Sequence, residues 1–147
     1  MSTVRKTIPD RPELNGILET CLYCDDVAVT RAFYERVFGF ESMVVEDRIV
    51  AMDAGQGHVL ILFRRGGTLT PVPVAGSFIP PHDGGGQQHF AFGIRGDAYD
   101  AWKQYLISEG VAIESEVDWP QGGKSLYFRD PDGHLGELAT PGLWSNY

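Results

Sequence analysis

Hydrophobic and polar positions along the chain predict the same order of elements twice: a strand, a helix and three further strands. In the first half, strands are expected at residues 17–24, 40–46, 48–53 and 57–64, with a helix at about 26–38. In the second half, strands are expected at residues 89–94, 111–117, 124–129 and 134–139, with a helix at about 97–109. The helical spacing in the first half rests on Val29, Phe33, Val37 and Phe40, and the helices stop at Gly39 and Gly110. Two tandem βαβββ units are therefore predicted.

The two halves can be laid over each other. Glu19 precedes Gly39 by 20 positions and His89 precedes Gly110 by 21, so Glu19 and His89 hold equivalent places at the start of each first strand. The last strands of the two halves begin with the same dipeptide, in "GHVLILF" from Gly57 and "GHLGELA" from Gly133, and counting along from there places Ile61 opposite Glu137. The repeat thus supplies four equivalent positions, three of which carry side chains that can bind a metal.

Glu19 raises a question of its own, because it interrupts the apolar run of "GILETCLYCDD". An ionised carboxylate without a partner in an apolar site costs several kcal/mol. If the two units pack as pseudo-symmetric halves of a curved sheet, Glu19, His89 and Glu137 converge and form a facial triad for a divalent ion. We therefore expect a cation to compensate Glu19. Taken singly, each residue has a structural alternative: Glu19 at a strand edge or paired with an arginine, His89 as a core histidine, and Glu137 at the surface.

The segment between the halves, "GGTLTPVPVAGSFIPPHDGGGQQ", is rich in proline and glycine and shows no periodic pattern. A linker of this length inside a compact domain is often functional, as a lid or a crossover. The predicted organisation is one domain made of an N-terminal extension, a first module, this linker, a second module and a tail, at residues 1–16, 17–65, 66–88, 89–142 and 143–147.

The charge composition of the chain indicates which kinds of molecule it is expected to bind. The formal net charge of −8 argues against nucleic acid and anionic membrane surfaces, and mildly favours neutral or cationic small molecules. No apolar run approaches the roughly 18–20 residues of a membrane span. The opening residues lack the apolar core of a signal peptide, so a cytoplasmic protein is expected.

The two cysteines, His58 and His134 are interpreted as structural, and the role of His82 is left open. Cys21 and Cys24 form a C-x-x-C within one strand, where alternation sends their side chains to opposite faces, unlike a redox pair. His58 and His134 fall on the opposite strand parity from the ligand positions and point away from the centre. His82 lies in the linker, within reach of a pocket mouth.

Three stretches, "LYCDDVAVTRAFYERVFGFE", "QHFAFGI" and "SLYFRDPDGHLGELATP", resemble the vicinal oxygen chelate superfamily. This family contains glyoxalases, fosfomycin-inactivating thiol transferases, extradiol dioxygenases and bleomycin-resistance proteins. The resemblance spans about residues 16–142 and implies an α+β fold, in which two βαβββ modules form a curved, open-barrel mixed sheet with helices outside. It also implies a homodimer, because in related two-unit proteins the barrel is commonly completed between two chains.

The resemblance maps the metal ligands onto Glu19, His89 and Glu137. The glyoxalase branch places a further Glu where this chain has Ile61, so three ligands resemble the thiol transferases and dioxygenases more closely. Ser125 and Tyr127 match substrate-lining positions of the thiol transferases. The potassium loop and the C-terminal substrate-binding arginine segment of those enzymes have no counterpart here.

The chemistry expected of such a site begins with a divalent ion (Mn, Ni, Zn or Fe) that two neighbouring substrate oxygens chelate. Glu19 or Glu137 is a candidate general base, and Tyr127 is a candidate proton donor with an alternative role in sheet packing. Lys124 is a candidate partner for an anionic substrate group, with a solvated loop lysine as the alternative.

The leading functional hypothesis is a metal-dependent lyase or isomerase of the glyoxalase type, acting on a small oxygen-rich substrate. Thiol transfer to an epoxide, with a thiol cosubstrate, is the second hypothesis, and dioxygenase activity is the third. A non-catalytic dimer that sequesters a cationic drug, as bleomycin-resistance proteins do, is the alternative from a different class.

Overall fold

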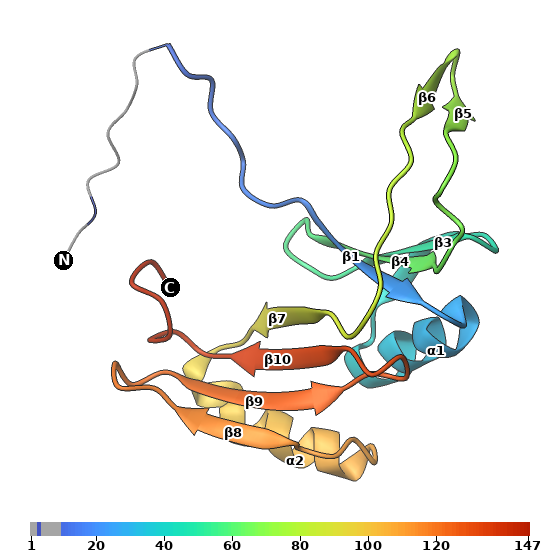
Figure 1. Cartoon of the computed structure of the whole chain (residues 1–147). Helices are drawn as coiled ribbons and strands as arrows, with labels where there is room; N and C mark the ends of the chain where they lie inside the picture. The colour runs from blue at the N-terminus through green and yellow to red at the C-terminus, as the bar shows by residue number, and fades with distance from the viewer. Residues whose placement is uncertain (1–2, 4–9) are drawn as a thin grey trace.

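The computed structural model describes residue 3 and residues 10–147, and it contains the two predicted βαβββ modules (Figure 1). The first module comprises β1 (Glu19–Cys24), α1 (Val27–Phe38), β2 (Glu41–Val45), β3 (Ile49–Asp53) and β4 (Val59–Arg64). The second comprises β7 (His89–Gly93), a 3-10 turn (Gly96–Ala98), α2 (Tyr99–Ser108), β8 (Ser115–Asp118), β9 (Lys124–Arg129) and β10 (Leu135–Ala139). The predicted order of elements is confirmed in both halves.

Each module forms one four-stranded mixed sheet. The strand orders are β1-β4-β3-β2 and β7-β10-β9-β8. The parallel neighbours are β1 with β4 in the first sheet and β7 with β10 in the second. Glu19 pairs with Val59 in the first sheet, and His89 pairs with Leu135 in the second. Ile61 and Glu137 each lie two residues further along, so the register places them at equivalent positions, as the sequence overlay predicts.

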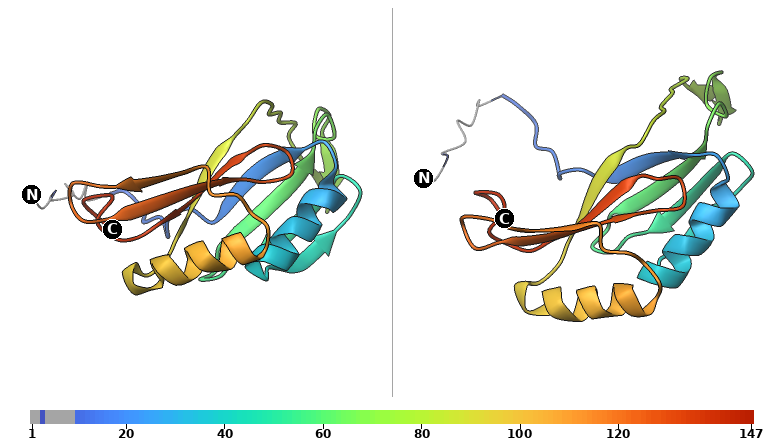
Figure 2. Two further views of the ribbon diagram at one scale, coloured as in Figure 1. Left: turned by 90° about the horizontal axis from the view of Figure 1, so that it is seen from below. Right: turned by 60° about the horizontal axis from the view of Figure 1, so that its bottom comes forward.

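Both helices cover one side of the two sheets, and the opposite faces are left free of helices (Figure 2). The fold is therefore α+β and open rather than a closed barrel. One core joins the helix-facing sides of both modules, with Tyr34 and Leu62 from the first and Phe90 and Phe128 from the second among its members. A smaller apolar cluster, built around Tyr23, Ile61 and Phe63, lies on the helix-free face of the first sheet.

Local sequence signals explain several boundaries. Asp26 caps α1 by accepting hydrogen bonds from the backbone N–H groups of Ala28 (3.0 Å) and Val29 (3.2 Å). Gly39 ends the helix at φ 67°, a left-handed conformation that glycine adopts without strain. In β10, a Cβ on Gly136 would lie 2.2 Å from the ring of its pairing partner Phe128, so only glycine lets that ring pack flat on the strand.

Two details differ from the predictions. The linker, which shows no periodic pattern in sequence, contains a hairpin formed by β5 (Val72–Val74) and β6 (Ser77–Ile79). In α1, Val29 is 52% exposed, and the buried face instead runs through Val27, Thr30, Tyr34 and Val37. The reason is that the hydroxyl groups of Thr30 and Tyr34 are buried against carboxylates of the second module. A pattern that counts only hydrophobic residues does not identify these two positions as buried.

Among the described residues, no helix is long and apolar enough to cross a membrane.

The Tyr34 hydroxyl links the modules by donating a hydrogen bond to Asp130 Oδ2 (2.9 Å), where both side chains are buried. Burial raises the pKa of Asp130, and the bond from Tyr34 acts in the opposite direction. Tyr34→Phe should lower the free energy of unfolding by about 1–3 kcal/mol at neutral pH, because it leaves a buried carboxylate oxygen without its donor. Since Tyr34 favours the charged form, the loss should fade as the pH falls through the raised pKa of Asp130.

Urea unfolding at several pH values would measure this loss. Tyr147→Phe is the matched control, since its hydroxyl makes only long contacts of 3.2 and 3.3 Å near the exposed C-terminus. A loss that is equal in both variants, or independent of pH, would contradict the assignment.

Candidate functional site

The helix-free face of the second sheet brings His89 and Glu137 together. His89 begins β7, Glu137 lies in the neighbouring strand β10, and His89 Nε2 is 3.3 Å from Glu137 Oε1. The two side chains differ in environment, since the His89 side chain is 52% exposed and that of Glu137 is only 6% exposed. The pair therefore has a buried acidic end and an open imidazole end, which is accessible to a ligand.

A chain of hydrogen bonds from Trp119 through Ser125 orients the carboxylate of Glu137. Trp119 Nε1 lies 2.8 Å from Ser125 Oγ, and Ser125 Oγ lies 2.5 Å from Glu137 Oε2. An indole N–H can only donate, so the Ser125 oxygen accepts from Trp119 and its own proton is donated to Glu137. This chain occupies Oε2 and leaves Oε1 directed at His89.

The tautomer of His89 is also determined by its surroundings. His89 Nδ1 lies 2.9 Å from the carbonyl oxygen of Leu135, which can only accept, so Nδ1 carries the proton. In neutral His89 the Nε2 lone pair then faces a carboxylate oxygen. This arrangement of an imidazole fixed by a backbone carbonyl is common around metal-ligating histidines.

The residues fit a divalent ion. Nitrogen and oxygen ligands that share an ion at about 2.0–2.2 Å lie about 3 Å apart, close to the separation of His89 and Glu137. The donor set also suits a cation, because Glu137 is buried and the second oxygen of its carboxylate already has a hydrogen-bond donor.

Tyr127 lies beside this pair, whereas Lys124 lies elsewhere. The ring centroids of Tyr127 and His89 are 6.3 Å apart, and burial together with the Glu137 charge raises the pKa of Tyr127. Tyr127 therefore keeps its proton at neutral pH. Lys124 has the strand parity of the core residues, with its Nζ 5.4 Å from the centre of the Tyr99 ring, so its position gives no support to the predicted role in substrate binding.

Glu19 is not joined to His89 and Glu137 within one chain. It begins β1 and is exposed, on the same strand parity as Cys21 and Tyr23 and thus on the helix-free face. The expectation that Glu19 is buried and needs a compensating cation is wrong for the single chain, because Glu19 is the first residue of β1 and lies in the exposed N-terminal part of the strand. One chain thus assembles two of the three predicted ligands.

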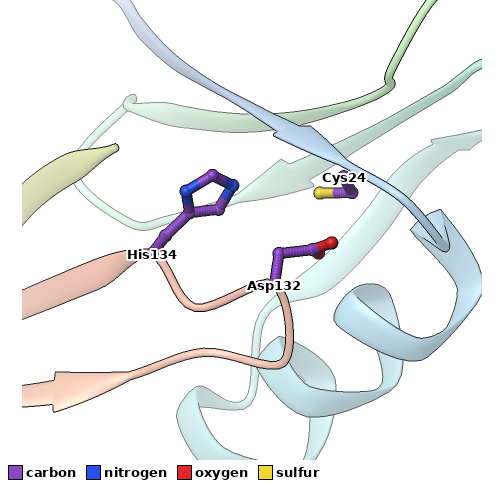
Figure 3. A group of neighbouring side chains, drawn as sticks. All are labelled: Cys24, Asp132 and His134. Carbon is purple, nitrogen blue, oxygen red and sulfur yellow. The ribbon is translucent and has the colours of Figure 1, made fainter. Parts of the chain in front are cut away.

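Across the described residues, a different trio of potential ligands lies close together: Cys24, Asp132 and His134, with ligand atoms within 4.8 Å of one another (Figure 3). Both nitrogens of His134 are engaged, since Nδ1 accepts from Gln88 N (2.8 Å) and Nε2 donates to the carbonyl oxygen of Tyr23 (2.7 Å). Asp132 is engaged at both oxygens, and burial strongly raises the pKa of the Cys24 thiol. We interpret this trio as a structural link between the modules.

The link reaches the residue next to His89. Tyr23 N donates to Gln88 Oε1 (2.8 Å), Gln88 N donates to His134, and His134 donates back to Tyr23 O, which closes a ring of bonds from β1 to the start of β7. His134 is thus structural, as its strand parity predicts. The other histidines outside the site also have partners: His58 contacts the Ile17 carbonyl oxygen, and His82 contacts the Tyr23 hydroxyl.

Sequence reasoning missed Trp119. It precedes the "PQGG" turn, two strands away from His89, and no spacing rule connects it with Glu137. Its role follows only from the antiparallel pairing of β9 with β10, which sets Ser125 near Glu137 and within reach of the indole.

Comparisons with known proteins agree with this fold. The family model of the Glyoxalase/Bleomycin resistance protein/Dioxygenase superfamily matches residues 16–138. A solved structure of lactoylglutathione lyase from Agrobacterium tumefaciens superposes with a TM-score of 0.81 at 32% identity, covering 91% of this chain and 99% of that one. Metallothiol transferase FosB from Bacillus licheniformis is 26% identical over 126 residues, which are 85% of this chain and 75% of the relative. The fosfomycin resistance protein FosX from Listeria monocytogenes shares the fold, with a TM-score of 0.63 at 23% identity over 89% of this chain and 97% of that one.

The chain therefore belongs to the Glyoxalase/Bleomycin resistance protein/Dioxygenase superfamily, and the family predicted from its sequence is confirmed. Its similarity extends both to a relative named as a lyase and to relatives named as metallothiol transferases.

The hydrogen bonds of the two histidines predict opposite tautomers. At a pH where both rings are neutral, His89 should carry its proton on Nδ1 and His134 on Nε2. Long-range proton–nitrogen correlation spectra of labelled protein would distinguish the two forms, with His134 as the internal control. An Nε2-protonated His89 would contradict the assignment of Nε2 as a free ligand atom.

Proposed function

We propose that this protein is a metal-dependent enzyme that transfers a thiol to a small, oxygen-bearing electrophile. The observation that carries this proposal is the pairing of His89 Nε2 with Glu137 Oε1 at 3.3 Å, backed by Ser125 and open to solvent on the His89 side. Similarity to metallothiol transferases supports thiol transfer, as does Ile61, which occupies the place where the glyoxalase branch carries a further carboxylate.

In this proposal His89 and Glu137 of one chain hold a divalent ion such as Mn, Ni, Zn or Fe. The third ligand is the partner subunit's Glu19 in a homodimer. Support comes from the exposure of Glu19 on the helix-free face and from its equivalence in register to His89. The two carboxylates would make the ligand set formally neutral around a divalent ion.

When bound, the ion would act as a Lewis acid that polarises a substrate oxygen. The protein side chains supply the rest of the chemistry. Ser125 keeps the Glu137 carboxylate in one orientation, and the Leu135 carbonyl oxygen keeps His89 in one tautomer. In the proposed reaction the thiol loses its proton to solvent, its sulfur bonds to a substrate carbon, and one carbon–oxygen bond of that carbon breaks. Tyr127 would protonate the released oxygen and regain a proton from solvent, so that the thiol proton balances the one that Tyr127 donates.

A lyase or isomerase acting on a thiol adduct is the second candidate. The 32% identity to lactoylglutathione lyase over nearly the whole of that chain favours it. The same residues would act on this substrate class, with Glu19 or Glu137 as general base. Dioxygenase activity is the weaker possibility, because the ferrous sites of that branch usually carry two His ligands. Sequestration of a cationic drug would need neither metal nor catalysis.

The test is metal content combined with activity. Protein purified without chelator should bind one divalent ion per chain, and His89→Ala and Glu137→Ala should abolish this binding. Ser125→Ala should weaken it by about 10- to 100-fold, because a supporting hydrogen bond to a ligand is removed. Ile61→Ala is the control, since it changes the equivalent position of the first module and should leave the metal content unchanged.

The reactions are then separated by substrate, with each candidate metal added in turn. Fosfomycin with a thiol tests transfer, a methylglyoxal–glutathione hemithioacetal tests the lyase, and catechols test the dioxygenase. Full metal occupancy in both alanine variants would refute the site. Absence of bound metal, together with drug binding measured by calorimetry, would instead indicate sequestration.

A further inference from the structure

The β5–β6 hairpin is an apolar arm that leaves the body of its own chain. In Figures 1 and 2 it rises from the first module on the side opposite the helices. Its large side chains are exposed, with Leu69 at 55%, Val74 at 48%, Phe78 at 59% and Ile79 at 49%. Neither strand belongs to either hydrophobic cluster of the chain. Because a two-stranded hairpin alone in water is only marginally stable, a contact outside this chain is indicated.

The base of the arm is fixed to the first module. Thr68 accepts a hydrogen bond from His82 N at 2.9 Å and donates one to the His82 carbonyl oxygen at 2.5 Å, which ties the two ends of the arm together. The His82 ring packs on Phe63 at a centroid distance of 4.6 Å, and its Nδ1 contacts the Tyr23 hydroxyl. The direction in which the arm leaves the body is therefore set by buried contacts.

The arm itself is stiff. Its two-residue turn has positive φ at both positions, 47° at Ala75 and 77° at Gly76, which matches the twist of a tight hairpin. Proline occurs before, within and after the strands, at positions 71, 73, 80 and 81, which restricts the backbone further. A rigid apolar arm loses little conformational entropy when it docks.

The charge distribution favours a second copy of this chain as the partner. Residues 69–81 contain no charged side chain, although 22% of the chain is charged and its net charge is −8. Two such acidic molecules repel each other wherever charged surfaces meet, and an uncharged arm removes this repulsion at the contact. A basic partner would instead be met by acidic side chains on the arm.

We propose that the arm, residues 69–81, docks on a second copy of this chain and covers the His89–Glu137 pair of that copy. The arm follows directly after the first module, which carries Glu19, and it extends on the helix-free side of that module. One subunit would therefore bring both the arm and Glu19 to the half-exposed His89 of the second copy. This inference rests on the proposed function for the identity of the covered site, but the dimer contact itself is independent of any reaction.

The experiment measures the dimer dissociation constant by sedimentation equilibrium in the presence of a chelator and without substrate. Phe78→Asp should raise this constant by about tenfold or more, because two-fold symmetry places Phe78 in the interface twice and each copy loses a buried ring. Ile107→Asp is the matched control: Ile107 is 52% exposed on α2 at the helix side, and its replacement should leave the constant unchanged.

Replacing residues 71–80 by two glycines gives a second variant that keeps the Thr68–His82 base, and it should be monomeric with unchanged circular dichroism. A monomeric wild-type protein would overturn the inference, as would a Phe78→Asp or arm-deleted dimer as stable as the wild type. Because neither metal nor substrate is present, failure here is separate from failure of the proposed reaction. Loss of metal binding in the arm-deleted protein would further support a metal site that is formed by two subunits.

Discussion

The structure depends on one constraint, the placement of a buried carboxylate. Glu137 lies in a central strand of the second sheet, where a charge without compensation is costly. Within the chain, Ser125 donates a hydrogen bond to one oxygen of this carboxylate, and the other oxygen faces the imidazole of His89. What remains is an electron-rich oxygen–nitrogen pair on an open face. The proposed metal site follows from the need to balance that charge.

Duplication of the βαβββ unit determines where the balancing groups can come from. The matching registers make Glu19 the counterpart of His89 and Ile61 the counterpart of Glu137, so the first module carries one carboxylate and one apolar side chain at these two positions. Within a chain, the ring of hydrogen bonds through Tyr23, Gln88 and His134 joins the end of β1 to the start of β7. That junction keeps Glu19, at the other end of β1, away from the His89–Glu137 pair. The proposed second chain would account for both the exposed Glu19 and the exposed arm.

Much of the fold and the proximity of His89 and Glu137 could be predicted from sequence, because the repetition is visible there. The equivalence of Glu19 with His89 needed only a count to the next helix-ending glycine, and the β-register agrees with it. The contacts between modules could not be predicted. Thr30 and Tyr34 are not among the apolar positions that predict the helix, yet they donate hydrogen bonds to Asp132 and Asp130 of the second module. Trp119 was missed because its link to Glu137 runs through Ser125 and depends on strand pairing. The β5–β6 hairpin was missed because its strands are short, Val72–Val74 and Ser77–Ile79.

The central claim is that the His89–Glu137 pair of one subunit is completed by the partner subunit's Glu19. The most direct test co-expresses Glu19→Ala and His89→Ala chains with different tags, isolates the mixed dimer and measures bound manganese. A mixed dimer has one intact site and one doubly defective site, so it should bind one ion per dimer at the wild-type affinity, while neither parent homodimer does. A mixed dimer as empty as its parents, or a Glu19→Ala homodimer that keeps full occupancy, would contradict the claim.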